Sequence, residues 1–207
     1  MTDMDTTEFV EAVRDETKTE RSRLGSSKSL YADTDGEMEP DAVLTAAADD
    51  ATEAADTFED WRDGEAGETF AAAADREREH ADAVTDKLDA YDRGETPAIV
   101  GFLRGQDETV ARLGALVGWT LAIQEKVSQC SGFFTGQADP RTASLFRGFG
   151  EDYEDTREAA LAALAEHCEN DEDWAAAAAA ATGAIEAAYD EYFETLEALG
   201  VNPKPVC

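Results

Sequence analysis

Basic residues are scarce in this sequence of 207 residues. Lysine and arginine together number 17 against 48 aspartates and glutamates, and the formal net charge is −31. A chain of this charge repels phosphate backbones and anionic lipid headgroups. The composition therefore argues against direct binding to nucleic acid or to a membrane surface, and it directs the search for partners towards proteins.

Long apolar runs are missing as well. No stretch approaches the 18 consecutive apolar residues that a membrane-spanning helix needs. The first five residues, Met1 to Asp5, are acidic and lack the basic-then-apolar layout of a signal peptide. We therefore predict a cytoplasmic protein.

Cysteine is rare, with only Cys130, Cys168 and Cys207 in the chain. They are widely separated, and none belongs to a Cys-x-x-Cys motif, so a disulfide framework or a small iron–sulfur domain is excluded. Cys130 and Cys168 lie in apolar surroundings, which predicts buried, reduced thiols. Cys207 ends the chain, and a redox role is the less favoured alternative for it.

Apolar residues are nevertheless plentiful, at 43% of the chain, which is too many for an acidic disordered tail. The acids are spread along the whole chain and not gathered in one block. A folded protein with a distributed acidic coat is typical of salt-loving cytoplasms, where carboxylates hold water and salt screens their repulsion. This pattern predicts a halophilic, archaeal type of protein.

Helical patterns run through almost the whole sequence. Alternating runs of β-branched residues, which would indicate strands, do not occur. Turn residues divide the chain into six expected long helices. We expect one helical domain over residues 1–199 and a short non-helical tail over 200–207. The predicted helices cover residues 7–33, 40–62, 65–91, 107–134, 141–168 and 172–199, with an apolar connector at 97–105.

Long helices joined by short turns predict an antiparallel bundle. The helix at 107–134 is apolar on all sides, so we expect it to be central, with Gly114 and Gly118 allowing a neighbouring helix to approach closely. The connector at 97–105 joins two helical hairpins. This topology predicts an all-α fold of the ferritin-like type: a four-helix bundle of the second to fifth helices with additional terminal helices.

The sharpest local motif is Glu77-x-x-His80 in the helix at 65–91. Residues three apart project from the same side of a helix, so this carboxylate and imidazole could share a metal. The apolar stripe of the helix passes through Glu77 and beside His80. Because burying a lone carboxylate costs several kcal/mol, a charged residue there calls for a partner.

The segment from Phe70 to Ala81, and above all Glu77-Arg78-Glu79-His80-Ala81, resembles the second-helix ligand motif of the rubrerythrin family. That family belongs to the ferritin-like di-iron carboxylate proteins. It draws one Glu from each of two helices and a Glu-x-x-His from each of the other two. The resemblance implies iron as the cofactor, with Glu77 bridging and His80 bound to one iron.

The preceding helix should contribute a carboxylate level with this motif. Counting outwards from the turn near Gly64 places Glu53 opposite Glu77 and Asp50 opposite His80. The apolar stripe of that helix passes closer to Asp50, while Glu53 has the longer side chain. Both remain candidate metal ligands.

The second hairpin departs from the family pattern. Glu125 lies in an apolar region, and the turn near Ala138 places it level with Glu151. Glu151-x-x-Glu154 then stands where the family has its second Glu-x-x-His. The apolar stripe of this helix runs instead through Tyr153, and if that face is inward one metal loses its ligands. His167, at the helix end, fits the helix dipole and not a metal.

Two functions follow. The resemblance implies a rubrerythrin-like oxidoreductase that handles peroxide, dioxygen or iron, with a di-iron or single-metal site completed by Asp50 or Glu53 and by Glu125. The alternative is a non-catalytic ferritin-like module without metal that acts as a regulatory protein, for example in transcription, through protein contacts. A homodimer is expected for such a fold, and the protein partner remains unassigned.

One net-basic segment, from Glu20 to Tyr31, interrupts the acidic chain. We expect Arg21, Arg23 and Lys28 to pair with nearby carboxylates, and contact with an anion or a partner is the alternative. No phosphate-binding loop, nucleophile elbow or Ser-His-Asp spacing occurs in the sequence.

Overall fold

The computed structural model describes residues 5–203, and Cys207 lies outside them. The described chain contains helices and no strands, which confirms the all-α prediction. The helices are α1 (Thr6–Glu16), α2 (Lys18–Leu24), α3 (Ser27–Asp33), α4 (Pro40–Asp60), α5 (Gly67–Thr85), α6 (Ala98–Arg104), α7 (Thr109–Gly136), α8 (Pro140–His167) and α9 (Asp171–Ala198).

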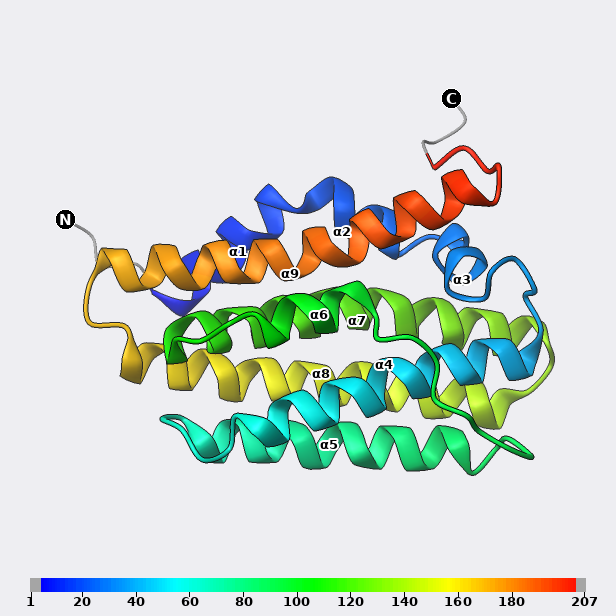
Figure 1. The fold of residues 1–207 in the computed structure, drawn as a ribbon, viewed down its shortest axis with the longest axis horizontal. Coiled ribbons are helices and arrows are strands. Elements are labelled where there is room, and N and C mark those ends of the chain that lie inside the picture. Colours follow the sequence, from blue (N-terminus) through cyan, green and yellow to red (C-terminus); the bar gives the residue numbers. More distant parts are fainter. Residues whose placement is uncertain (1–4, 204–207) are drawn as a thin grey trace.

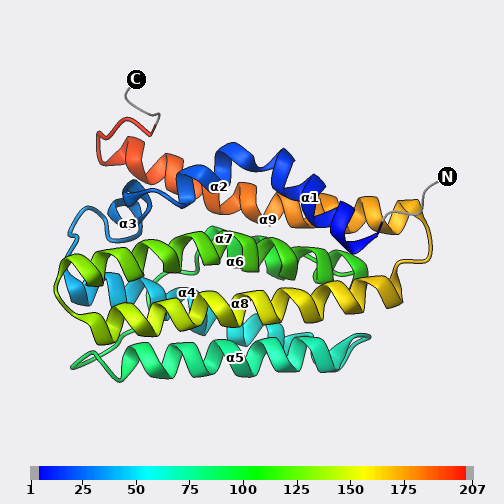
Figure 2. The same ribbon diagram turned by 180° about the vertical axis from the view of Figure 1, so that it is seen from behind.

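Two antiparallel hairpins make up most of the bundle (Figure 1). One hairpin consists of α4 and α5, and the other consists of α7 and α8. Helix α9 packs along α7 on the side away from α4 and α5, and α1 and α2 lie against α9, as the view from behind shows (Figure 2). The bundle therefore has three layers, with the second hairpin in the middle.

Helix α7 is the central helix, as its all-round apolar sequence predicts. Its residues Gly114 and Gly118 face the backbone of α9, and a methyl group on either would overlap the carbonyl oxygens of Ala177 and Ala181. The predicted close approach is confirmed. Its partner is the alanine-rich part of α9, where small side chains let the two backbones meet.

Helix ends follow local chemistry. Asp5 and Glu8 form a capping box at the start of α1. Asp139 accepts hydrogen bonds from the first turn of α8, which begins at Pro140, and Asn170 caps α9 in the same way. These residues satisfy backbone N–H groups that a helix start leaves without partners, which is why the boundaries of the later helices lie close to the predicted ones.

Three parts of the predicted helix pattern are wrong. The expected helix at 7–33 is three short helices, because the chain breaks at Thr17 and again at Gly25 and Ser26 as it bends across α9. The helix expected to reach Tyr91 ends at Thr85. The connector at 97–105 contains α6, whose Ile99, Val100 and Leu103 are buried against neighbouring helices.

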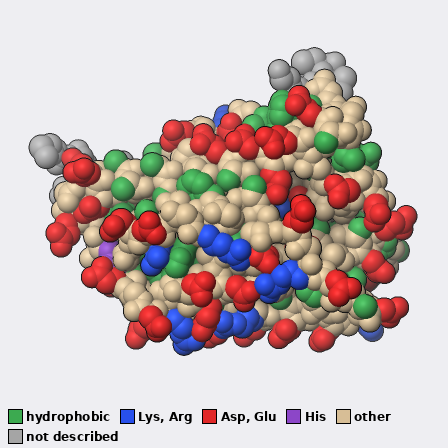
Figure 3. Space-filling view, viewed as in Figure 1, with side chains coloured by type: hydrophobic (Ala, Val, Ile, Leu, Met, Phe, Trp, Pro, Cys, Tyr) green, Lys and Arg blue, Asp and Glu red, His purple; other side chains and the backbone are tan. Residues whose placement is uncertain are grey.

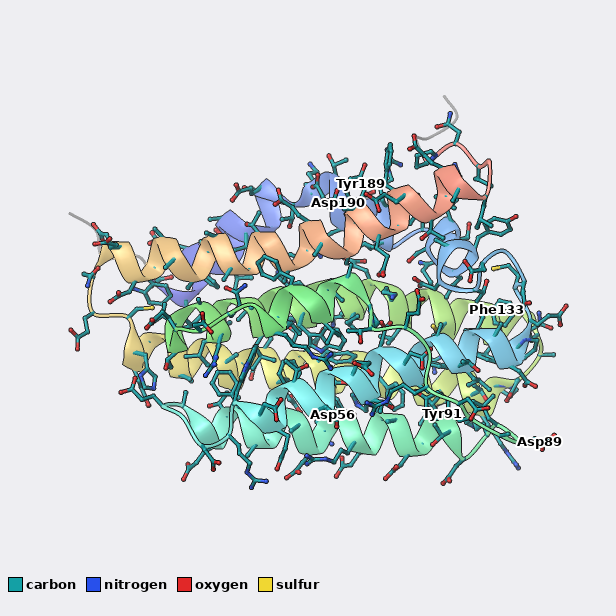
Figure 4. All side chains as sticks on the ribbon, in the orientation of Figure 1. Asp56, Asp89, Tyr91, Phe133, Tyr189 and Asp190 are labelled. Carbon is teal, nitrogen blue, oxygen red and sulfur yellow. The ribbon has the colours of Figure 1, made fainter. Side chains whose placement is uncertain are left out.

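The surface is acidic, as the composition requires. Acidic side chains are scattered over all parts of the face seen in Figure 3, whereas most of its Lys and Arg side chains gather over the lower half, where α4 and α5 lie. Tyr189 and Asp190 stand on the outer side of α9, and Tyr91 lies beside α4 (Figure 4). The Tyr91 hydroxyl donates a hydrogen bond to Asp49, 2.7 Å away, and so holds the chain after α5 against α4.

Candidate functional site

A buried carboxylate, Glu77, lies where the two hairpins meet. Its side chain projects from α5 and is 2% exposed. The indole Nε1 of Trp119 on α7 donates to Oε1 at 2.8 Å, and the hydroxyl of Tyr153 on α8 donates to Oε2 at 3.2 Å. Each oxygen therefore has a neutral donor from the opposite hairpin, which offsets part of the cost of burial.

His80 lies one turn further along α5 and is equally buried. Its Nε2 is 3.0 Å from Oδ2 of Asp152 on α8, and its ring packs 4.0 Å from the ring of Phe149. Its Nδ1 lies 3.5 Å from Oε2 of Glu77 without forming a hydrogen bond. Burial by itself lowers the pKa of the imidazole, but Glu77 and Asp152 outweigh it and raise the pKa above the ordinary value.

Asp152 is a partner that the sequence reasoning missed. It binds His80 and also lies 3.6 Å from Nη1 of Arg76, so it joins two residues of α5 to α8. The apolar stripe of α8 runs through Tyr153. Because Asp152 lies directly beside this stripe, the same apolar pattern could have identified it as a candidate. We call Glu77, His80, Trp119, Asp152 and Tyr153 the Glu77 cluster.

A second group centres on Lys126 of α7. Its Nζ lies 2.7 Å from Asp50 of α4 and 3.2 Å from Asp33 of α3, and all three side chains are largely buried. Burial raises the pKa of Asp33 to about 6, although Lys126 opposes the shift. Burial lowers the pKa of Lys126, but the two carboxylates outweigh it, so the ammonium stays charged. These three residues are the Lys126 cluster.

Glu53, the other candidate on α4, is bound by arginines. Nη2 of Arg104 lies 2.7 Å from its Oε2, and Nη1 of Arg93 lies 3.2 Å from its Oε1. Thr96 donates a further hydrogen bond at 3.0 Å. The segment around α6 thus provides the cations for this carboxylate, a role that the sequence did not reveal.

The three candidate acids of the second hairpin lie away from Glu77. Glu125 points towards α2, where Nη2 of Arg21 binds it at 2.6 Å. Glu151 is exposed, and Glu154 accepts a hydrogen bond from Gln124 at the surface. The inward residue between them is Tyr153. The pair formed by Arg21 confirms its predicted pairing with a carboxylate. Lys28 donates a hydrogen bond to the backbone carbonyl of Asn202.

Two spaces adjoin these clusters. A cavity of about 20 Å³, lined mainly by apolar side chains, is also bordered by His80, Tyr153, Asp50 and Lys126, and its size corresponds to about one water molecule. A larger cleft of about 240 Å³ lies between α3, α4 and α9 and also reaches Asp50 and Lys126. The Lys126 cluster thus separates the surface cleft from the inner cavity.

The seven candidate ligands are therefore not gathered at one point. The structure brings Glu77 and His80 together, places Asp50 at the nearby cavity, and pairs Glu53 and Glu125 with arginines. Within residues 5–203, no group of three or more His, Cys, Asp or Glu side chains is arranged to hold a metal ion. In the same range, no helix is long and apolar enough to cross a membrane.

No protein-family model, no curated protein and no solved structure matches the chain.

Proposed function

We propose that this protein is a non-catalytic, ferritin-like helical module in which internal ion pairs take the place of a metal pair. In this proposal it serves as a structural or regulatory partner of another protein. The two antiparallel hairpins joined by the α6 crossover support the ferritin-like assignment. The formal net charge of −31 favours a protein partner over nucleic acid or lipid.

The observation that carries the proposal is the position of Lys126. Its ammonium lies between Asp50 and Asp33, at 2.7 and 3.2 Å, beside the cavity that also borders His80. A metal cation bound to Asp50 would have to displace this ammonium or sit next to it. Because like charges repel strongly in a buried site, the resident cation opposes metal binding.

The remaining carboxylates support the same interpretation. Glu53 is neutralised by Arg104 and Arg93, and Glu125 is held by Arg21 on the far side of α7. A di-iron pair of the rubrerythrin kind needs a carboxylate from each of these two helices beside Glu77. The residues present do not fit such a pair, and we derive no reaction through one.

An iron titration tests the proposal. Protein purified without a tag in high salt is incubated with Fe(II) under nitrogen, desalted, and assayed for iron and for its thermal midpoint. We expect no retained iron and an unchanged midpoint. Two irons per chain, lost in His80→Ala, would overturn the proposal and support the oxidoreductase.

A gain-of-binding variant sharpens the test. Lys126→Ala removes the resident ammonium and leaves Asp33 and Asp50 facing each other, so we expect Mn(II) or Fe(II) to raise the thermal midpoint of this variant. Lys87→Ala, which removes an exposed lysine, is the matched control and should not respond. A Lys126→Ala protein that ignores both metals would show that this ammonium is not what keeps metal out.

One observation favours a second candidate, a rubrerythrin-like site for a single metal. Nδ1 of His80 is buried without a hydrogen-bond partner and lies 3.5 Å from Oε2 of Glu77. Glu77 and His80 would hold the metal, which would supply redox chemistry, and Tyr153 would donate its hydrogen bond beside it. This candidate would be supported if the wild-type protein and Glu53→Gln each kept one iron per chain and His80→Ala kept none.

A further inference from the structure

One exposed surface of this acidic protein is almost free of acids. The chain has 48 acids in 207 residues, yet residues 127–150, at the end of α7 and the start of α8, contain only Asp139. Asp139 caps α8, because its carboxylate accepts hydrogen bonds from the backbone of Arg141 and Thr142 and from the Thr142 hydroxyl. The acidic coat is therefore interrupted at this end of the second hairpin.

Burial does not explain the missing acids. Ser128 of α7 and Ser144 and Arg147 of α8 are exposed, whereas the first half of α7, which also lacks acids, is largely buried. Figure 2 shows α8 and the adjoining end of α7 with no helix of the described chain in front of them. Depletion of charge on an exposed surface is typical of the central part of a protein–protein interface.

A groove of about 330 Å³ lies between α7 and α8 on this face. Gly150 lies in its α8 wall, and a methyl group added there would meet no atom of the chain within 4 Å. Glycine inside a helix is destabilising relative to alanine, and no close neighbour in the described chain requires it at this position. Gly150 therefore leaves room for the backbone of another helix, as Gly118 does for α9.

The charges along this groove change sign at Gly150. Arg147 precedes the glycine, whereas Glu151 and Glu154 follow it, and all three border the groove. Their spacing of four and then three residues places them on the same side of α8. Within residues 5–203, no ion pair involves Arg147. Two copies of α8 laid antiparallel about Gly150 therefore place Arg147 of each copy opposite Glu154 of the other.

We propose that the protein forms a two-fold dimer through this face, with α8 of each copy lying in the groove between α7 and α8 of the other. Two Arg147–Glu154 pairs, related by the two-fold axis, fix the register. The charges favour a second copy as the occupant, because two chains of net charge −31 repel each other wherever their acids meet. Repulsion is weakest where both surfaces lack acids. The dimer does not depend on whether the bundle binds metal.

Sedimentation velocity of the full chain in high salt measures the dimer, because salt screens the long-range repulsion between copies. We expect the mass of two chains at high protein concentration and dissociation on dilution. Ser128→Glu adds a carboxylate to the wall of the groove and should raise the Kd of the dimer about a hundredfold. Ala176→Glu, which adds the same charge at an exposed position of α9, is the matched control and should leave the Kd unchanged.

A charge swap tests the register of the two helices. Arg147→Glu should weaken the dimer, and Arg147→Glu/Glu154→Arg should restore it, because the pairs form again with their charges exchanged. These variants change exposed side chains, so their circular dichroism should match that of the wild type. A wild-type protein that stays monomeric at every concentration would overturn the proposal, and so would a dimer indifferent to Ser128→Glu. A swap that fails to restore the dimer would overturn the antiparallel register.

Discussion

The ammonium of Lys126 lies 2.7 Å from the carboxylate of Asp50, and this pair joins the two hairpins of the bundle. Both side chains are close to nine-tenths buried, at 12% and 11% exposure. Removing one partner of such a pair leaves an uncompensated charge, which costs about 3–5 kcal/mol. The pair therefore contributes to holding α4 against α7.

We expect Lys126→Met to lower the free energy of unfolding by about 3 kcal/mol, because Asp50 and Asp33 are left facing each other. Urea unfolding in high salt measures the loss. The double variant Lys126→Met/Asp50→Asn should be less destabilised than the sum of the single variants. Additive effects would show that the two groups do not interact in solution.

Two glycines of α7 allow matched substitutions that we expect to change stability in opposite directions. Gly118→Ala should destabilise the protein by several kcal/mol, since its methyl group would overlap the backbone of Ala181 on α9. Gly132→Ala, in the same helix with open space around its Cβ position, should stabilise it by about 1 kcal/mol. Thermal unfolding of both variants decides the matter, and equal effects would contradict the close contact of α7 with α9.

Substitutions of Glu77 should show how much its two hydrogen-bond donors contribute to the stability of the fold. Glu77→Gln keeps an acceptor for Trp119, whereas Glu77→Ala leaves the indole N–H and the Tyr153 hydroxyl buried without a partner. We expect a loss of about 1 kcal/mol for the first variant and of about 3 kcal/mol for the second. Chemical unfolding followed by tryptophan fluorescence measures both, and a fully stable Glu77→Ala protein would contradict the buried network.

The pKa of Asp33 predicts a pH dependence of stability. Because its folded pKa is raised from 3.8 to about 6, the folded state binds the proton more tightly than the unfolded state. Its contribution to stability is therefore fully present below pH 4 and is lost as the pH rises to about 6. Asp33→Asn should make stability rise more steeply with pH across that interval. An unchanged slope would mean that Asp33 titrates normally.

The cysteines should differ in reactivity. Burial raises the pKa of the Cys130 thiol strongly and that of Cys168 to about 11, so neither is a thiolate at pH 8. In a Cys207→Ser background, we expect slow labelling of half-buried Cys168 by a disulfide reagent and labelling of Cys130 only after unfolding. Mass spectrometry of the labelled peptides distinguishes the two. Fast labelling of Cys130 would contradict its burial.

Much of the fold follows from the sequence by itself. The period of the apolar residues predicts the long helices. In the structure, Pro40, Asp139 and Asn170 stand at the starts of three of them, because caps and turns are local interactions. The all-round apolar character of α7 predicts its central place. The local pattern fails between residues 7 and 33, where contact with α9 breaks one expected helix into three.

The sequence also predicts which polar residues of α4 and α5 are buried, because they lie on or beside apolar stripes. These residues are Asp50, Glu53, Glu77 and His80. Only the tertiary structure decides their partners. Lys126, Arg104 and Asp152 come from distant parts of the chain, and nothing in their local sequence indicates which carboxylate or imidazole they contact. Periodicity determines which face of a helix is buried, whereas the packing of helices determines which charges meet there.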